Sequence, residues 1–153
     1  MTTRASWTDR TGTWQGTNRL WFDPAAPAFE SASTARLRDA AGADCLLLEY
    51  TWSHEERGHD GVLLLHLPTG AGPIEAVWCD SFHSGGGLLH FQGTLDAEHG
   101  IDVLGSYAAP EGPDWGWRIQ LLQEAGAGWQ LRMFNISPAG EEFPAVAVDY
   151  RRV

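Results

Sequence analysis

The apolar residues of this chain occur in short alternating runs, each ended by residues typical of turns. Residues 13–22 alternate and stop at Asp23-Pro24, and residues 45–53 stop at the polar stretch 54–58. Alternation sends successive side chains to opposite faces, which is the pattern of a half-buried β-strand. About ten such runs follow one another at intervals of roughly 8–15 residues, a spacing that predicts an all-β sandwich or barrel.

The other predicted strands are bounded by Gly, Pro, Ser and Asp. They cover residues 33–38, 61–67, 73–82, 88–95, 101–108, 115–123, 129–136 and 143–151. Residues 29–41 are ambiguous, because their Ala and Arg content favours a helix, whereas their Ser and Thr alternation favours a strand. We predict a strand there, and expect helix only as a short segment before the first strand.

Short connections between consecutive strands favour an antiparallel up-and-down sheet. Closing this sheet removes the exposed edges that would promote aggregation, so we predict a barrel of about ten strands rather than an open sheet. The 153 residues are enough for one domain with a substantial core, and residues 1–153 are taken as that single domain. Hydrophobic residues at 43% and charged residues at 20% are typical of a folded globular chain.

The chain carries a formal net charge of −10. Such an acidic surface repels phosphate backbones and anionic lipids, which argues against nucleic-acid and membrane partners. No apolar run is long enough to span a bilayer, and the N-terminal residues lack the apolar stretch of a secretory signal, so a cytoplasmic location is expected. Cys45 and Cys79 lie in apolar stretches and are expected to be reduced, inert and structural.

Alternation also predicts which side chains face the barrel interior. The predicted lumen is aromatic and aliphatic with a few polar groups, which is the usual composition of a small-molecule site. The candidate ligand-binding residues are Tyr50, Trp52, His54, His90, Tyr107, Trp117, Met133, Asn135 and Tyr150, with Asn18 and His66 as further polar groups. A lumen completely filled by the same aromatic side chains is the alternative that the strand number leaves open.

The segment Gly12-Thr13-Trp14-Gln15-Gly16 is similar to the Gly-x-Trp motif that opens the first strand of lipocalins and their calycin relatives. In that superfamily the Trp packs across the closed end of the barrel, which implies this position for Trp14. Gly16 is expected to let the first strand bend. With Trp78-Cys79-Asp80-Ser81-Phe82, Gly105, Trp117-Arg118-Ile119 and Tyr150-Arg151, the chain looks like a bacterial calycin-like barrel of the domain-of-unknown-function 1579 type, more distantly similar to nitrobindin and fatty-acid-binding proteins.

Nitrobindins are ten-stranded barrels that bind haem through a His late in the chain. The six His residues here are His54, His59, His66, His83, His90 and His99, and none follows the seventh predicted strand. The haem ligand implied by the resemblance is therefore missing at its position, and no cofactor is expected.

Two local clusters suggest other chemistry. In His54-Glu55-Glu56-Arg57-Gly58-His59 the two His residues are five apart, whereas a helical zinc motif needs a spacing of four, and the segment predicts a hairpin turn. Asp80, Ser81 and His83 lie within four residues of one another. Because neighbouring strand residues point to opposite faces, we expect Asp80 and Ser81 to hold the barrel rim by hydrogen bonds rather than to form a catalytic triad.

The expected function is the binding of a small hydrophobic or amphipathic molecule in the lumen of a monomer or homodimer. An enzyme that uses His54, His66 or His90 is an alternative, although catalysis is not the favoured hypothesis.

A protein-interaction module with a filled barrel is a second alternative. It would need a large apolar patch outside the barrel, for which Trp21 and Leu63-Leu65-Leu67 are the candidates.

Overall fold

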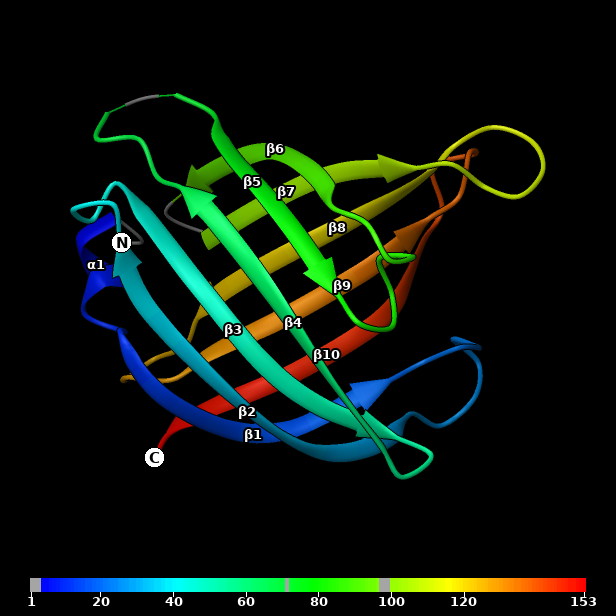
Figure 1. Cartoon of the computed structure of the whole chain (residues 1–153), viewed down its shortest axis with the longest axis horizontal. Helices are drawn as coiled ribbons and strands as arrows, with labels where there is room; N and C mark the ends of the chain where they lie inside the picture. The colour runs from blue at the N-terminus through cyan, green and yellow to red at the C-terminus, as the bar shows by residue number, and fades with distance from the viewer. Residues whose placement is uncertain (1–3, 71, 97–99) are drawn as a thin grey trace.

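The computed structural model describes residues 4–70, 72–96 and 100–153. A short helix, α1 (Arg4–Thr8), precedes β1 (Gly12–Leu20), β2 (Phe29–Ala40), β3 (Cys45–His54), β4 (Arg57–His66), β5 (Ile74–Asp80), β6 (Leu89–Asp96), β7 (Gly100–Tyr107), β8 (Trp115–Gln123), β9 (Trp129–Ile136) and β10 (Glu142–Arg152). Each strand pairs antiparallel with the next, and β1 also pairs with β10, so the sheet closes into a barrel (Figure 1). The predicted ten-stranded barrel is confirmed, including the strand at the ambiguous stretch.

The connections divide between the two ends of the barrel (Figure 1). Helix α1 and the connections β2–β3, β4–β5 and β8–β9 lie at one end, which we call the closed end. The connections β1–β2, β3–β4, β5–β6, β7–β8 and β9–β10 lie at the other end, which we call the open end. Residues far apart in the sequence therefore meet at each end.

Three indole rings cover the closed end. Trp7 of α1, Trp14 of β1 and Trp129 of β9 are fully buried, and the Trp129 ring lies edge-to-face at 6.3 Å from Trp7 and 6.1 Å from Trp14. The Arg152 guanidinium lies 4.3 Å from the centre of the Trp14 ring, a favourable cation–π arrangement. The expected position of Trp14 at the closed end is confirmed.

The lumen is packed with apolar side chains. Leu37, Leu48, Leu63 and Trp78 are successive cross-strand partners on β2 to β5, and all four are fully buried. Inward-facing residues of all ten strands join them in one contiguous core, and each fully buried side chain of this size contributes about 1.5–3 kcal/mol. Among the described residues, these side chains fill the middle of the lumen, so space for a ligand is sought at the open end.

Gly16 lies where β1 and β10 approach each other closely. A Cβ atom at this position would collide with the carbonyl oxygen of Asp149. The strand pairing of β1 with β10 is regular before and after Gly16, at Gln15↔Arg151 and Asn18↔Val148. Strand β1 curves along the barrel wall (Figure 1). Lack of space for a side chain accounts for the glycine here.

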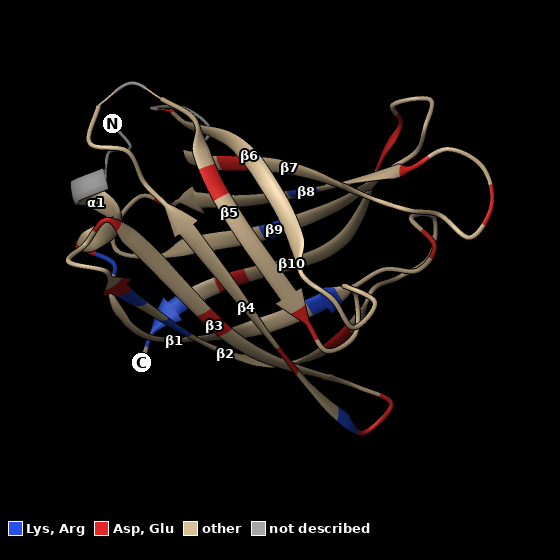
Figure 2. Ribbon diagram, turned by 45° about the horizontal axis from the view of Figure 1, so that its top comes forward, with Lys and Arg blue, Asp and Glu red and all other residues tan. Residues whose placement is uncertain are grey.

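Among the described residues, Asp80 is the one charged side chain that is buried, and acidic residues recur on the strands and in the open-end loops (Figure 2). Arg118 pairs with Asp102 at 2.8 Å and with Glu142 at 2.7 Å. Such partly exposed pairs contribute little to stability, because water and salt screen them.

Within the described ranges, no helix is both long enough and apolar enough to cross a bilayer.

Candidate functional site

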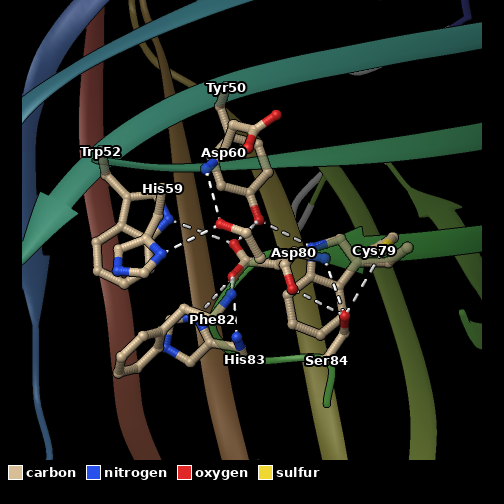
Figure 3. Close-up of polar contacts among 11 residues, drawn as sticks. Tyr50, Trp52, His59, Asp60, Cys79, Asp80, Phe82, His83 and Ser84 are labelled. Atoms are coloured by element: carbon tan, nitrogen blue, oxygen red, sulfur yellow. Dashed lines mark hydrogen bonds and ion pairs between the residues drawn. The ribbon is translucent and has the colours of Figure 1, made fainter. Parts of the chain in front are cut away.

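A polar network is buried just inside the open end. Tyr50 of β3, Gly61 of β4 and Asp80 of β5 are cross-strand partners in one row. Because Gly61 has no side chain, the Tyr50 ring can lie across it, where a Cβ atom would overlap the ring and hydroxyl. The Tyr50 hydroxyl donates to Asp80 Oδ2 at 2.6 Å and accepts from Trp78 Nε1 at 2.9 Å (Figure 3).

Asp80 also fixes the path of the β5–β6 loop. Its Oδ1 accepts hydrogen bonds from the backbone N–H of Phe82 at 2.8 Å and of His83 at 2.9 Å. The Ser84 hydroxyl accepts from the Asp80 N–H at 3.0 Å and donates to the Asp80 carbonyl at 2.9 Å (Figure 3). These bonds turn the chain sharply after β5, so that His83 returns over the end of the barrel.

His83 is packed between the network and the aromatic wall. Its Nδ1 lies 3.4 Å from Asp80 Oδ1. Its ring stacks on Trp52 at 5.3 Å and lies 5.4 Å from the ring of Trp117. Among the residues that the structure describes, neither His83 Nδ1 nor Trp117 Nε1 has a well-directed hydrogen-bond partner. Two polar groups at this end are therefore buried without a well-directed hydrogen bond, which lowers the stability of a packed interior.

The protonation states of the network are set by burial and by these contacts. Burial by itself would raise the pKa of Asp80, but the His83 imidazole, the Tyr50 hydroxyl and the His83 N–H together lower it to about 2. Burial, reinforced by the charge of Asp80, raises the pKa of Tyr50 well above its ordinary value. At neutral pH Asp80 is a carboxylate and Tyr50 a hydrogen-bond donor, so the pair acts as a fixed anchor.

A cavity of about 360 Å³ opens beside His83. Its walls come from the β1–β2, β5–β6, β7–β8 and β9–β10 regions and consist of Trp21, Phe22, Pro24, His83, Trp115, Trp117, Asn135, Phe143, Pro144 and Ala145. Apart from the indole N–H groups of its three Trp residues, only His83 and Asn135 are polar in this set. The Tyr107 hydroxyl donates to Asn135 Oδ1 at 2.5 Å, which leaves the Asn135 amide N–H groups as donors. We call this the open-end cavity.

Exposed aromatic rings surround the rim next to this cavity. Phe22 is 60% exposed and Phe29 54% exposed. The rings of Phe22, Phe29 and Phe82 lie 5.3, 5.0 and 6.2 Å from the His54 ring. Adjacent exposed apolar side chains of this kind typically mark a binding surface.

A larger groove of about 700 Å³ lies on the outer face of β4 to β7. Leu64, Val77, His90 and Leu104 are among its lining residues. Its His90 is exposed, and the buried network around Asp80 does not reach it. We therefore assign the candidate site to the smaller open-end cavity, where apolar walls and buried polar groups meet.

The structure brings several of the predicted site residues to the open end. Trp117 and Asn135 line the cavity, and Tyr107 lies behind Asn135. Tyr50 belongs to the Asp80 network, and so does Trp52, whose Nε1 lies 3.4 Å from Asp80 Oδ2. His54 belongs to the aromatic rim.

Other predicted residues face inward but lie in the packed core. Met133 and Tyr150 are buried. The Tyr150 hydroxyl shares a 2.7 Å hydrogen bond with Ser33 Oγ, and the Tyr150 ring lies 4.4 Å from Trp129 of the closed end. Asn18 is likewise buried, as expected for the lumen.

The placement of His90 and His66 in the lumen is wrong. Both are exposed on the outer face, because their neighbours Phe91 and Leu65 occupy the inward positions of β6 and β4.

The prediction of an outer apolar patch at Leu63-Leu65-Leu67 is also wrong, because all three side chains are buried. Trp21 is half-buried in the wall of the open-end cavity. Cys45 and Cys79 are free and only partly buried.

The hairpin turn predicted for the first polar cluster and the rim hydrogen bonds predicted for the second are confirmed. Residues 54–59 form a tight hairpin, with Glu55 and Glu56 at φ 50° and 62°. Asp80 points inward and holds the rim as described, whereas the Ser81 hydroxyl accepts from the Asp60 N–H at 3.1 Å and lies 3.2 Å from His59 Nδ1. Asp80 and Ser81 thus address different faces.

Sequence reasoning missed His83, Phe22 and Gly61 as site residues. His83 and Phe22 lie in loops, where alternation no longer indicates direction. For Gly61 the sequence did contain a signal. It is a Gly on β4 that pairs with an inward-facing Tyr on β3 and an inward-facing Asp on β5, and its missing side chain leaves room for a hydrogen bond between them.

Within the described part of the chain, no group of three or more His, Cys, Asp or Glu residues is arranged to hold a metal ion.

Fold and site together define a closed ten-stranded antiparallel barrel, covered by indoles at one end and carrying a small aromatic cavity at the other. Residues 3–152 match the model of a family described as protein of unknown function (DUF1579), and the chain belongs to this family. The sequence matches no curated protein.

Proposed function

We propose that the protein binds a small hydrophobic or amphipathic molecule in the open-end cavity. The observation that carries the proposal is a cavity of about 360 Å³ with apolar walls and two polar side chains, His83 and Asn135. Small-molecule sites typically have volumes of about 300–1,000 Å³, apolar walls and a few placed polar groups.

The hydrogen bonds of Asp80 support this proposal. They hold the β5–β6 loop, and with it His83, in one conformation. A site whose walls are fixed before the ligand arrives loses less conformational entropy on binding. The Gly-x-Trp opening, with Trp14 buried at the closed end, also supports a relationship to the calycin superfamily, in which barrels hold small ligands.

Binding can be tested with N-phenyl-1-naphthylamine, a neutral probe whose emission rises in apolar surroundings. We expect the wild-type protein to enhance its emission in a saturable manner. Phe22→Ala removes a cavity wall that is mostly exposed, so it should weaken binding about fivefold with little loss of stability. Leu104→Ala is the matched control, because Leu104 is 46% exposed and lines the outer groove instead.

Two results would contradict the proposal. One is a wild-type protein that leaves the probe emission unchanged. The other is a loss of binding in Leu104→Ala with none in Phe22→Ala, which would transfer the function to the outer groove and favour the interaction-module alternative.

A further inference from the structure

We propose that the ligand of the open-end cavity is a compact, uncharged aromatic compound with a hydroxyl group, its ring against Trp117 and its hydroxyl between His83 and Asn135. This inference rests on the proposed function and extends it to a chemical class. Three features of the cavity carry it: its depth, the flat rings around it and the hydrogen-bonding groups that remain free.

The depth of the cavity limits the ligand to a compact shape. Trp117 and Asn135 are cross-strand partners on β8 and β9, and the next inward-facing pair toward the closed end is Ile119↔Met133. Ile119 and Met133 are buried in the contiguous core. They form a floor directly below Trp117 and Asn135, so a long alkyl chain has no channel to enter.

The walls favour a flat ring. Trp117 is stacked nearly parallel to Trp78, with 5.5 Å between ring centres and 13° between planes. The His83 ring adjoins Trp117 at 5.4 Å, and Trp115 and Phe143 complete the wall. Aromatic rings gain more from contact with such surfaces than saturated groups of equal area do.

The free hydrogen-bonding groups match a hydroxyl. The Asp80 carboxylate beside His83 Nδ1 favours a proton on that nitrogen, which leaves His83 Nε2 as an acceptor. Asn135 Oδ1 is occupied by Tyr107, so Asn135 offers N–H donors. A single ligand hydroxyl can donate its O–H to His83 Nε2 and accept a hydrogen bond from the Asn135 amide at its oxygen.

Charge argues against ionic ligands. No Arg or Lys lines the cavity, so an anionic head group would lose its hydration without gaining a cationic partner. An ammonium group would bring several donors to a wall in which His83 Nε2 is the main free acceptor. The Asp80 charge is already compensated by its own donors.

Four naphthalene compounds of similar size test the inference: 2-naphthol, 2-methoxynaphthalene, 2-naphthoate and 2-naphthylmethylammonium. Affinities at neutral pH are measured by quenching of Trp fluorescence. We expect 2-naphthol to bind roughly tenfold more tightly than 2-methoxynaphthalene, which keeps the acceptor oxygen but lacks the donor. The two ions should bind more weakly than either.

Two variants separate the polar contacts from the fold. His83→Phe keeps an aromatic ring and removes Nε2, so it should abolish the roughly tenfold preference for 2-naphthol over 2-methoxynaphthalene. Asn135→Leu removes the donor to the oxygen of both compounds, so it should weaken both. Saturable binding of 2-methoxynaphthalene by His83→Phe shows that the cavity is still formed.

Equal affinities for 2-naphthol and 2-methoxynaphthalene, or tightest binding of either ion, would overturn the inference and leave the proposed function standing. The same holds if His83→Phe weakens both neutral compounds equally and Asn135→Leu weakens neither. Failure of all four compounds and of N-phenyl-1-naphthylamine to bind would overturn the proposed function as well.

Discussion

At the scale of single residues, the buried charge of Asp80 depends on donors from separate parts of the chain. Tyr50 and Trp52 come from β3, and the two backbone N–H groups come from the loop after β5. An ionised carboxylate with 2% exposure would be strongly destabilising without such partners. Each donor therefore contributes to stability as well as to the geometry of the open end.

Two Tyr→Phe variants can separate a charged from a neutral hydrogen bond. Tyr50→Phe should lower the free energy of unfolding by about 2 kcal/mol, because the lost bond is to a carboxylate. Tyr150→Phe deletes an equally buried hydroxyl that is bonded to Ser33, and should cost about 1 kcal/mol. Urea unfolding monitored by Trp fluorescence gives both values. Equal costs, or a larger cost for Tyr150→Phe, would argue against the role given to Asp80.

The low pKa of Asp80 predicts a specific sensitivity to acid. The pKa of about 2 in the folded protein lies below the ordinary value of 3.8, so the contribution of Asp80 is complete above about pH 5 and is lost as the pH falls toward 2. The full contribution is about 2 kcal/mol, of which about 1 kcal/mol should be lost by pH 3. The difference in free energy of unfolding between wild type and Asp80→Asn should therefore decrease by about 1 kcal/mol between pH 6 and pH 3. A difference that stays constant over this interval is the contrary result.

At the scale of strands, the sequence was most informative where side-chain direction alternates regularly. The bounds of β8 and β9 agree with the predicted residues 115–123 and 129–136, because alternation is a local property that turn residues interrupt clearly. His90 was placed on the wrong face because Leu88-Leu89-His90-Phe91 has apolar residues in both registers. Loop residues such as His83 could not be placed, since their position depends on hydrogen bonds between distant segments.

Strand β4 offers a direct test of the room that Gly61 provides. Gly61→Ala should push the Tyr50 ring away from Asp80 and lower the free energy of unfolding by about 1–3 kcal/mol, the usual cost of overpacking. Gly58→Ala, in the same strand, is the matched control, because an added Cβ there meets no atom within 4 Å. Chemical denaturation of both variants measures the difference, and similar stabilities would show that Gly61 is not needed for the network.

At the scale of the whole molecule, the barrel keeps its packed end and its candidate site apart. Trp7, Trp14 and Trp129 cover the closed end, whereas Trp115 and Trp117 line the cavity at the open end. The filled middle of the lumen lies between them. The two ends should therefore respond independently to a ligand, and the indole groups can report on each end separately.

The most direct measurement is a titration of ¹⁵N-labelled protein with N-phenyl-1-naphthylamine, followed through the indole N–H signals. Binding in the open-end cavity predicts saturable shifts of the Trp115 and Trp117 signals, with those of Trp7, Trp14 and Trp129 unchanged. Unchanged indole signals throughout, or shifts confined to backbone amides of the outer groove such as those of Val77 and Leu104, would contradict the account.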